Sequence, residues 1–304
     1  MRQKAAHAVK ELRTLRDCIR WGASRFAEAG LSYGHGTDNA IDEAAYLVLN
    51  ALALPPDLNG IYHNCRLTRG EREAVIERLV ERIETRKPGA YLTGEAWFMG
   101  LRFHVNEAVL IPRSPIAELI ERRFEPWVQP DLAAQILDLC TGSGCIGIAC
   151  AYAFPDATIT LSDVSEAALA VARENIALHH LEDRVSALRS DVFDTLPPQR
   201  YDLIVANPPY VNAPDMAALS EEFRHEPELG LAAGADGLDI VRRILGDASR
   251  YLTPDGILVV EVGNSAEALV EAYPELPFLW LEFERGGHGV FLLTAESLRE
   301  APNV

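Results

Sequence analysis

The amino-acid sequence predicts an α/β fold, in which a mostly parallel sheet is covered by helices on both faces and preceded by a helical domain. From residue 135 onward, short apolar segments alternate with amphipathic ones, which is the order of strands and helices in a parallel sheet. Upstream of residue 88, apolar residues recur only at helical spacing. The last two expected strands are joined by a short glycine-rich turn and should bring one antiparallel strand into the sheet. A chain of 304 residues has room for both parts.

Residues 1–87 are expected to form the helical domain. One helix should begin after Thr68, because Thr68 and Glu71 have the spacing of a capping box. Asp38 is the expected cap of a second helix over 40–52, which a pair of prolines would end. The Lys-Pro-Gly sequence that follows residue 86 is the expected end of this domain.

Residues 88–112 are expected to form a hairpin linker, and residues 113–304 the sheet-bearing domain. Aromatic and β-branched residues alternate in the linker, with a turn signal at Met99-Gly100. Strands are expected at 136–139, 158–161, 185–188, 201–205, 256–262, 279–283 and 290–293. Helices are expected at 115–124, 145–154, 166–179, 238–251 and 265–273.

The charge of the chain excludes some partners and compartments. The formal net charge of −17 argues against holding duplex nucleic acid mainly through its phosphates. Residues 91–304 carry 14 basic against 33 acidic side chains, whereas residues 1–90 carry 14 against 12. Seven basic side chains fall within the first 25 residues, which suits either a transit peptide or, as we favour, an ordinary amphipathic helix.

Cysteine spacing and hydropathy suggest a cytoplasmic protein. The five cysteines have neither Cys-x-x-Cys spacing nor nearby histidines, so we expect no disulfide framework and no metal site. Apolar runs of the length that a membrane span requires are not found.

A glycine-rich segment follows the first expected strand and opens a helix. Gly142-x-Gly144-x-x-Gly147 fits the dinucleotide fingerprint, and Asp163 lies 21 residues after Gly142, where a ribose-binding acid belongs. An NAD or NADP enzyme is therefore one interpretation, and a turn that only packs helix on strand is another. Asp138 favours a third, because a carboxylate here would repel a pyrophosphate and attract a cation such as the ammonium or sulfonium of S-adenosylmethionine (SAM).

The Asp-x-x-x-Gly-x-Gly arrangement resembles the first motif of class I SAM-dependent methyltransferases. That resemblance implies a seven-stranded sheet, mostly parallel, whose last strand is antiparallel. It also implies that Asp163 accepts the ribose hydroxyls and that Asp191-Val192 meets the adenine. The cofactor-binding residues implied are Asp138, Cys140, Thr141, Gly142, Ser143, Gly144, Asp163, Asp191, Val192 and Asn207.

Asn207-Pro208-Pro209-Tyr210 follows the fourth expected strand, where ligand crevices form in such sheets. In a purely structural interpretation, these four residues form a rigid turn. The functional interpretation starts from a planar NH2 nitrogen, whose conjugated lone pair attacks a methyl carbon poorly. Two fixed acceptors, the Asn207 side-chain oxygen and the Pro208 carbonyl, would localise that lone pair, and proline holds them in place. Tyr210 would pack on the flat substrate group, so the four residues predict methyl transfer to a planar nitrogen.

With the segments around Pro88-Gly89, Ile111-Pro112-Arg113 and Glu226-Pro227, nearly the whole chain resembles the protein glutamine methyltransferase family. Its release-factor branch typically reads Ile-Pro-Arg-Pro-x-Thr-Glu. Here Ser114 follows Arg113, so the chain looks like the branch that modifies large-subunit ribosomal protein three. The release-factor branch, DNA adenine methylation and a non-catalytic ribosome assembly factor remain the alternatives.

The resemblance further implies a helical domain that binds the protein substrate, either as the free protein or in an assembly intermediate with RNA nearby. It also implies that hairpin aromatics near Phe98 to Phe103 shape the pocket, although core packing explains each of them equally well. Arg113 could position Glu118 or a substrate group, or could form a surface salt bridge. No membrane contact and no direct binding of duplex DNA are expected.

Overall fold

The structure, a computed structural model, describes residues 1–131 and 133–301. By its internal contacts the chain divides into two compact units. The first, the helical unit, contains Met1–Glu95 together with the short segment Ser220–His225. The second, the sheet unit, contains Ala96–Leu219 and Glu226–Val304. The division falls inside the first strand of the hairpin, whereas the sequence suggested a domain boundary after residue 87. No helix of the described part is both long and apolar enough to cross a bilayer.

The helical unit consists of amphipathic helices around an apolar core. Its elements are α1 (Arg2–Glu11), α2 (Leu15–Glu28), α3 (Ala40–Ala51), η1 (Gly60–Asn64), α4 (Arg69–Thr85) and α5 (Gly89–Thr93). Thr68 caps α4 with the expected capping box. The cap of α3 was predicted wrongly: the carboxamide of Asn39, and not Asp38, accepts hydrogen bonds from Ile41 and Asp42. Asn is as good a cap as Asp, and the helix begins at Ala40, as expected.

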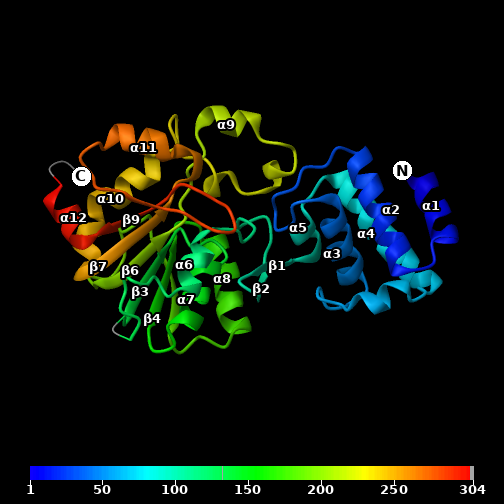
Figure 1. The fold of residues 1–304 in the computed structure, drawn as a ribbon, viewed down its shortest axis with the longest axis horizontal. Helices are drawn as coiled ribbons and strands as arrows, with labels where there is room; N and C mark the ends of the chain where they lie inside the picture. The colour runs from blue at the N-terminus through cyan, green and yellow to red at the C-terminus, as the bar shows by residue number, and fades with distance from the viewer. Residues whose placement is uncertain (132, 302–304) are drawn as a thin grey trace. The chain divides into compact units, whose positions relative to one another are not determined.

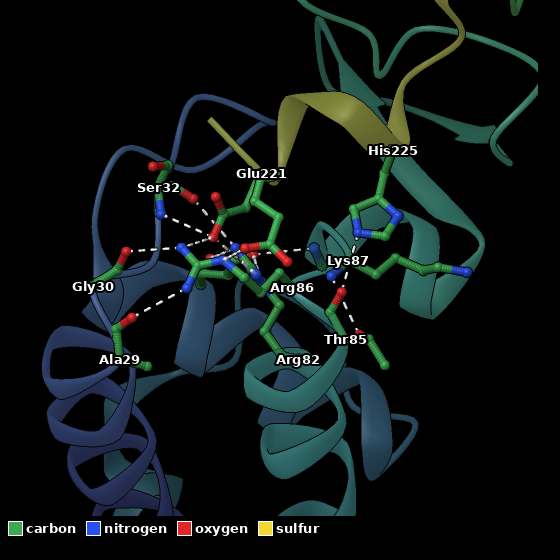
Figure 2. Close-up of polar contacts among 12 residues, drawn as sticks. Ala29, Gly30, Ser32, Arg82, Thr85, Arg86, Lys87, Glu221 and His225 are labelled. Carbon is green, nitrogen blue, oxygen red and sulfur yellow. Dashed lines mark hydrogen bonds and ion pairs between the residues drawn. The ribbon is translucent and has the colours of Figure 1, made fainter. Parts of the chain in front are cut away.

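A buried ion cluster fixes the segment 220–225 to the helical unit (Figure 2). Glu222 is fully buried and accepts from the Ser32 amide at 3.1 Å and from Arg86 at 2.8 Å. Arg82, also fully buried, donates to Glu43 at 2.9 Å and lies 3.7 Å from Glu222. The Arg86 guanidinium also reaches the carbonyls that end α2. Charges this deeply buried are stable only when paired, so each member depends on the others.

The sheet unit contains a two-stranded hairpin and a seven-stranded sheet. The hairpin is formed by β1 (Glu95–Phe98) and β2 (Leu101–His104). The sheet has the order β5-β4-β3-β6-β7-β9-β8. Its strands are β3 (Gln135–Leu139), β4 (Thr158–Asp163), β5 (Val185–Arg189), β6 (Tyr201–Ala206), β7 (Leu252–Glu261), β8 (Leu279–Leu281) and β9 (Val290–Thr294). All neighbours from β5 to β7 are parallel, and β9 runs antiparallel to both β7 and β8, as expected.

Helices cover both faces of this sheet (Figure 1). One face packs on α6 (Ile116–Glu121), α7 (Cys145–Ala153) and α8 (Glu166–Leu178). The other packs on α10 (Asp239–Tyr251), α11 (Ala266–Ala272) and α12 (Ala295–Glu300). Successive residues of β3 alternate between the two cores, with Ile136 in one and Leu137 in the other. Both faces are therefore apolar, which explains the continuous apolar runs in the sequence.

Several elements differ from the expectation. The helix predicted over 115–124 covers only Ile116–Glu121, and β7 begins at Leu252 instead of residue 256. The segment after the tetrad contains α9 (Ala213–Ala218), η2 (Phe223–His225) and η3 (Glu228–Gly230), which were not predicted. These elements are too short to show a hydrophobic period.

We predict that Glu222→Ala destabilises the helical unit by roughly 3 kcal/mol, because it removes the carboxylate shared by Arg86 and the buried Arg82, and leaves Arg82 with Glu43 alone. Hydrogen exchange of the α4 amides measures this. Glu221→Ala is the matched control, since that carboxylate is 67% exposed and lies 3.3 Å from Arg86. Its effect should stay below about 1 kcal/mol. Equal effects of the two substitutions would contradict the assignment of the buried cluster.

Candidate functional site

The polar residues predicted for the site meet at the carboxyl ends of β3, β4 and β6. Two adjoining cavities open there, both within the sheet unit. The first, of about 110 Å³, lies against the ends of β4 and β5. The second, of about 70 Å³, lies against the start of α7 and the tetrad. Four residues line both cavities: Leu110, Cys140, Asn207 and Gly230. The shared wall places two candidate ligand spaces side by side.

The glycine loop turns tightly between β3 and α7. Gly142 and Gly144 have φ of 56° and 84°, which favours glycine at both positions. Gly147 meets a different requirement, because a Cβ there would collide with Leu161 on β4. The third glycine therefore lets α7 pack closely on the sheet. Cys140 also has a positive φ of 56°, so the chain is constrained already at the end of β3.

Asp138 holds this loop from beneath. Its Oδ2 accepts from the Thr141 hydroxyl at 2.6 Å and from the Gly147 amide at 2.9 Å. Its Oδ1 is buried and has no partner among the residues described. Burial raises the pKa of Asp138 to about 7, against the two hydrogen bonds that lower it. Asp138 lines neither cavity. The structure thus shows a role in fixing the loop, and its pairing with a cofactor cation stays a prediction.

Asp163 lies on the wall of the first cavity, at the end of β4. Its two carboxylate oxygens accept from the amides of Gly142 and Ser165, both at 2.9 Å. Burial raises its pKa, and the amide bonds partly offset that effect. These bonds join the glycine loop to the next strand and aim the carboxylate into the cavity rim, where ribose hydroxyls could reach it.

Asp191 and Val192 line the same cavity beyond β5. The sequence did not reveal that the Asp191 carboxylate is already engaged: Arg243 of α10 donates to it at 2.7 Å. Arg243 is therefore a candidate for orienting Asp191 toward a base. Its only sequence signal is its place on the polar face of an amphipathic helix, which does not distinguish it from a surface arginine.

The tetrad forms a corner at the end of β6. Asn207 lies in the wall shared by both cavities, Pro209 faces the first, and Pro208 and Tyr210 face the second. Within the described parts of the chain, nothing donates a hydrogen bond to the Asn207 carboxamide or the Pro208 carbonyl. Tyr210 is anchored, because its carbonyl accepts from Ser265 at 2.7 Å and its hydroxyl donates to Glu261 at 3.1 Å.

Arg113 points to a partner other than those expected. Its guanidinium donates two 2.6 Å hydrogen bonds to Glu226, and the Glu226 carboxylate also accepts from the Ile111 amide. Glu118 instead accepts from the backbone amides of Glu284 and Arg285. The suggested pairing of Arg113 with Glu118 is therefore wrong. The alternative expectation of a salt bridge is met, with the buried Glu226 as the acid instead of a surface side chain. The real pair ties the second cavity's rim at 111–113 to the loop after the tetrad.

The hairpin aromatics do not line the site. Phe98 and Phe103 are 5% and 0% exposed and belong to the apolar core under α6, α7 and α8. Neither lines either of the two cavities. Residues just downstream, Val109 to Arg113, line the cavities instead of the hairpin aromatics. Core packing wins because large aromatic side chains gain more from full burial than from a polar rim.

The charged side chains that line the first cavity are acidic. Asp163 and Asp191 lie on its wall, whereas no Lys or Arg of the described residues lines it. A pyrophosphate would meet repulsion there, which argues against the NAD interpretation. Apolar side chains such as Val192 and Ile240 complete the wall. This acidic and apolar lining fits a cationic nucleoside better than an anionic dinucleotide. No group of three His, Cys, Asp or Glu side chains that could hold a metal occurs in the described ranges.

The strand order, the glycine loop and the open corner after β6 define a methyltransferase of the α/β class. In agreement, the family model of the methyltransferase small domain matches residues 124–229.

Comparison with curated proteins gives the family. A ribosomal protein uL3 glutamine methyltransferase of Francisella tularensis is 48% identical over 297 residues, covering 97% of this chain and 95% of that protein. One of Xanthomonas campestris is 51% identical over 293 residues, covering 96% and 95%. The chain belongs to the ribosomal protein uL3 glutamine methyltransferase family.

A solved structure supports the fold. The hMettl16 catalytic domain, solved in complex with the MAT2A 3'UTR hairpin 6, is similar with a TM-score of 0.50 and 18% identity. The match covers 64% of this chain and 75% of that one. At this identity, the likeness concerns the fold alone.

The buried state of Asp138 predicts a pH effect on stability. Its pKa is about 7 in the fold and about 4 in an unfolded chain. The native state therefore binds the proton more tightly, and this stabilisation is lost as pH rises toward and through 7. Asp138→Asn keeps an oxygen for both hydrogen bonds without the charge. Relative to wild type, the variant should gain roughly 1–3 kcal/mol of unfolding free energy between pH 5 and pH 8. Urea denaturation at both values measures it, and a constant difference would contradict the buried charge.

Proposed function

We propose that this protein transfers a methyl group from SAM to the side-chain amide nitrogen of a glutamine in ribosomal protein uL3. One observation carries the proposal: two hydrogen-bond acceptors that receive no donor from the described residues face the second cavity, on Asn207 in the wall shared with the first cavity and on the adjacent Pro208. A planar NH2 group entering the second cavity would supply the donors that they lack. The names of the relatives agree with this substrate.

The first cavity is the proposed SAM site. Asp163 would accept the ribose hydroxyls, and Asp191 with Val192 would face the adenine. The loop from Cys140 to Gly144 would border the methionine part, because it contributes residues to both cavities. When bound there, SAM supplies a methyl group that is already activated by its positive sulfur.

The tetrad corner would prepare the nucleophile. The Asn207 side-chain oxygen and the Pro208 carbonyl accept the two N–H bonds of the glutamine amide. Because both acceptors are fixed, they favour a nitrogen whose lone pair is localised and directed toward the methyl carbon. Holding the reactants in this geometry contributes on the order of 7–11 kcal/mol. The nitrogen would form one new bond to the methyl carbon while the bond from that carbon to sulfur breaks, which releases S-adenosylhomocysteine. The surplus amide proton would then leave to solvent, so no strong base is required.

The same contacts would select glutamine over glutamate. A carboxylate has no N–H to donate, so it would leave both acceptors unpaired and face their negative ends. Sites built to hydrogen-bond a substrate group reject analogues without it by roughly 10⁴-fold.

The helical unit is the proposed site of substrate-protein binding, and the cytoplasm the proposed compartment. Six of the seven basic residues within the first 25 are exposed, on α1, α2 and the turn between them: Arg2, Lys4, Lys10, Arg13, Arg16 and Arg20. Such side chains would attract the RNA of an immature ribosomal particle.

We predict that Asn207→Ala lowers kcat for methylation of uL3 by roughly 100- to 1,000-fold, because it removes one of the two acceptors. Binding of S-adenosylhomocysteine, measured by calorimetry, should persist within a few-fold. The matched control is Asn212→Ala, which removes a carboxamide that only caps α9. Retention of full activity by Asn207→Ala would contradict the mechanism.

Charge reversal on the helical unit tests the proposed role of RNA. Arg13→Glu, Arg16→Glu and Arg20→Glu combined should reduce methylation of uL3 within an isolated ribosomal particle by roughly 10-fold at physiological salt. Labelled SAM reports the methylation, and free uL3 serves as the reference substrate. An unchanged rate of methylation on the particle would contradict the proposed attraction of RNA by these side chains.

A further inference from the structure

A buried carboxylate stands behind the tetrad, and the mechanism above makes no use of it. Glu261 ends β7 and is 6% exposed. Its Oε2 accepts from the Ser114 hydroxyl at 2.5 Å, and its Oε1 accepts from the Tyr210 hydroxyl at 3.1 Å. An acid buried to this degree is costly unless it is paired, so its two hydroxyl partners indicate a defined task.

Tyr210 is held at three separate points. Glu261 takes its hydroxyl, Ser265 donates to its carbonyl at 2.7 Å, and its ring lies against Gly263. At Gly263, which has a φ of 47°, an added Cβ would come within 2.6 Å of the Tyr210 ring. The contacts at Ser265 and Gly263 fix the backbone and one edge of the ring, and the bond to Glu261 fixes the direction of the hydroxyl.

Surrounding charges keep this bond oriented. Burial raises the pKa of Glu261, while the Ser114 and Tyr210 hydroxyls and the positive Arg113 lower it. Arg113 is itself neutralised by Glu226 through two 2.6 Å bonds. Glu261 accepts from both hydroxyls, so the Tyr210 hydroxyl is directed at Glu261.

We propose that Glu261 is a positioning residue, which fixes the Tyr210 ring as the wall of the glutamine cavity. The proposal deepens the function above and depends on it for the identity of the substrate. Tyr210 lines the second cavity, whereas Glu261 lines neither cavity. Glu261 therefore acts through Tyr210, and its loss should lower the rate of methyl transfer more than the binding of the cofactor.

A double-mutant cycle tests this. We compare wild type, Glu261→Gln, Tyr210→Phe and the double variant by kcat and KM on uL3. Each single variant should lose roughly 10- to 100-fold in kcat, the value of a hydrogen bond to a charged group. Tyr210→Phe keeps the ring and removes only the bond. The kcat of the double variant should therefore be no more than about 3-fold below that of the less active single variant. If the loss in the double variant instead equals the product of the two single losses, the proposal is overturned.

Glu118→Gln is the matched control. It also weakens a buried acid that receives two hydrogen bonds, here from the backbone at 284 and 285. It should lower the melting temperature and leave kcat unchanged, whereas Glu261→Gln should lower kcat at equal affinity for S-adenosylhomocysteine. If Glu261→Gln changes only the melting temperature, Glu261 is merely structural and the proposal fails.

A readout without substrate separates this proposal from the proposed function. In protein labelled with ¹³C-tyrosine, the ring signals of Tyr210, assigned through Tyr210→Phe, should shift and broaden in Glu261→Gln but not in Glu118→Gln. Failure of the wild type to methylate uL3 would defeat the function and leave this measurement intact. Unaltered Tyr210 signals in Glu261→Gln would overturn the positioning role whatever the activity.

Discussion

Two hydrogen-bond acceptors held at the carboxyl end of β6, with no donor in the described fold to occupy them, are the constraint on which the rest depends. Buried or half-buried polar groups are normally satisfied within a protein. Asn207 lies in the wall shared by the two cavities, and Pro208 faces the second. The fold keeps their acceptors at a fixed place because proline removes backbone freedom on both sides of the corner. In the proposed function, this pair would select a planar group with two N–H donors.

Carboxylates fix the surrounding loops by accepting hydrogen bonds from them. Asp138 and Asp163 accept from the glycine loop, and Glu226 accepts from the loop at 111–113. Glu261 does the same for Tyr210. An acid that accepts from backbone or hydroxyl donors orders a loop more strongly than a neutral group, at the cost of burying a charge. This arrangement leaves the first cavity bordered by acids, which suits a cationic cofactor.

The parts of the fold and site that depend on local patterns were predictable. Strands β3, β4, β6 and β9 have clear apolar periods, and the glycine loop and tetrad have fixed spacings. The partners of Arg113, Asp191 and Tyr210 were not predictable. Each pair joins residues 51 to 113 positions apart, and one sequence carries no signal of which distant acid a given side chain meets. The hairpin phenylalanines were ambiguous from the start, because an aromatic residue suits a core and a pocket equally.

The segment 220–225 leaves the sheet unit after the tetrad, packs with the helical unit and returns at Glu226. It contains one short element, the three-residue 3₁₀ helix η2, so tertiary ion pairs, and not helix propensity, decide its place. The loop after the tetrad therefore has anchors of the same kind at Glu222 and Glu226, each a buried carboxylate that accepts from an arginine.

The most direct test of the central claim is a crystal structure of this protein with S-adenosylhomocysteine and a uL3 peptide that contains the target glutamine. The account predicts that the amide nitrogen lies within about 3 Å of both the Asn207 side-chain oxygen and the Pro208 carbonyl, facing the sulfur. A glutamine bound elsewhere, or one whose amide nitrogen contacts neither acceptor, would contradict it.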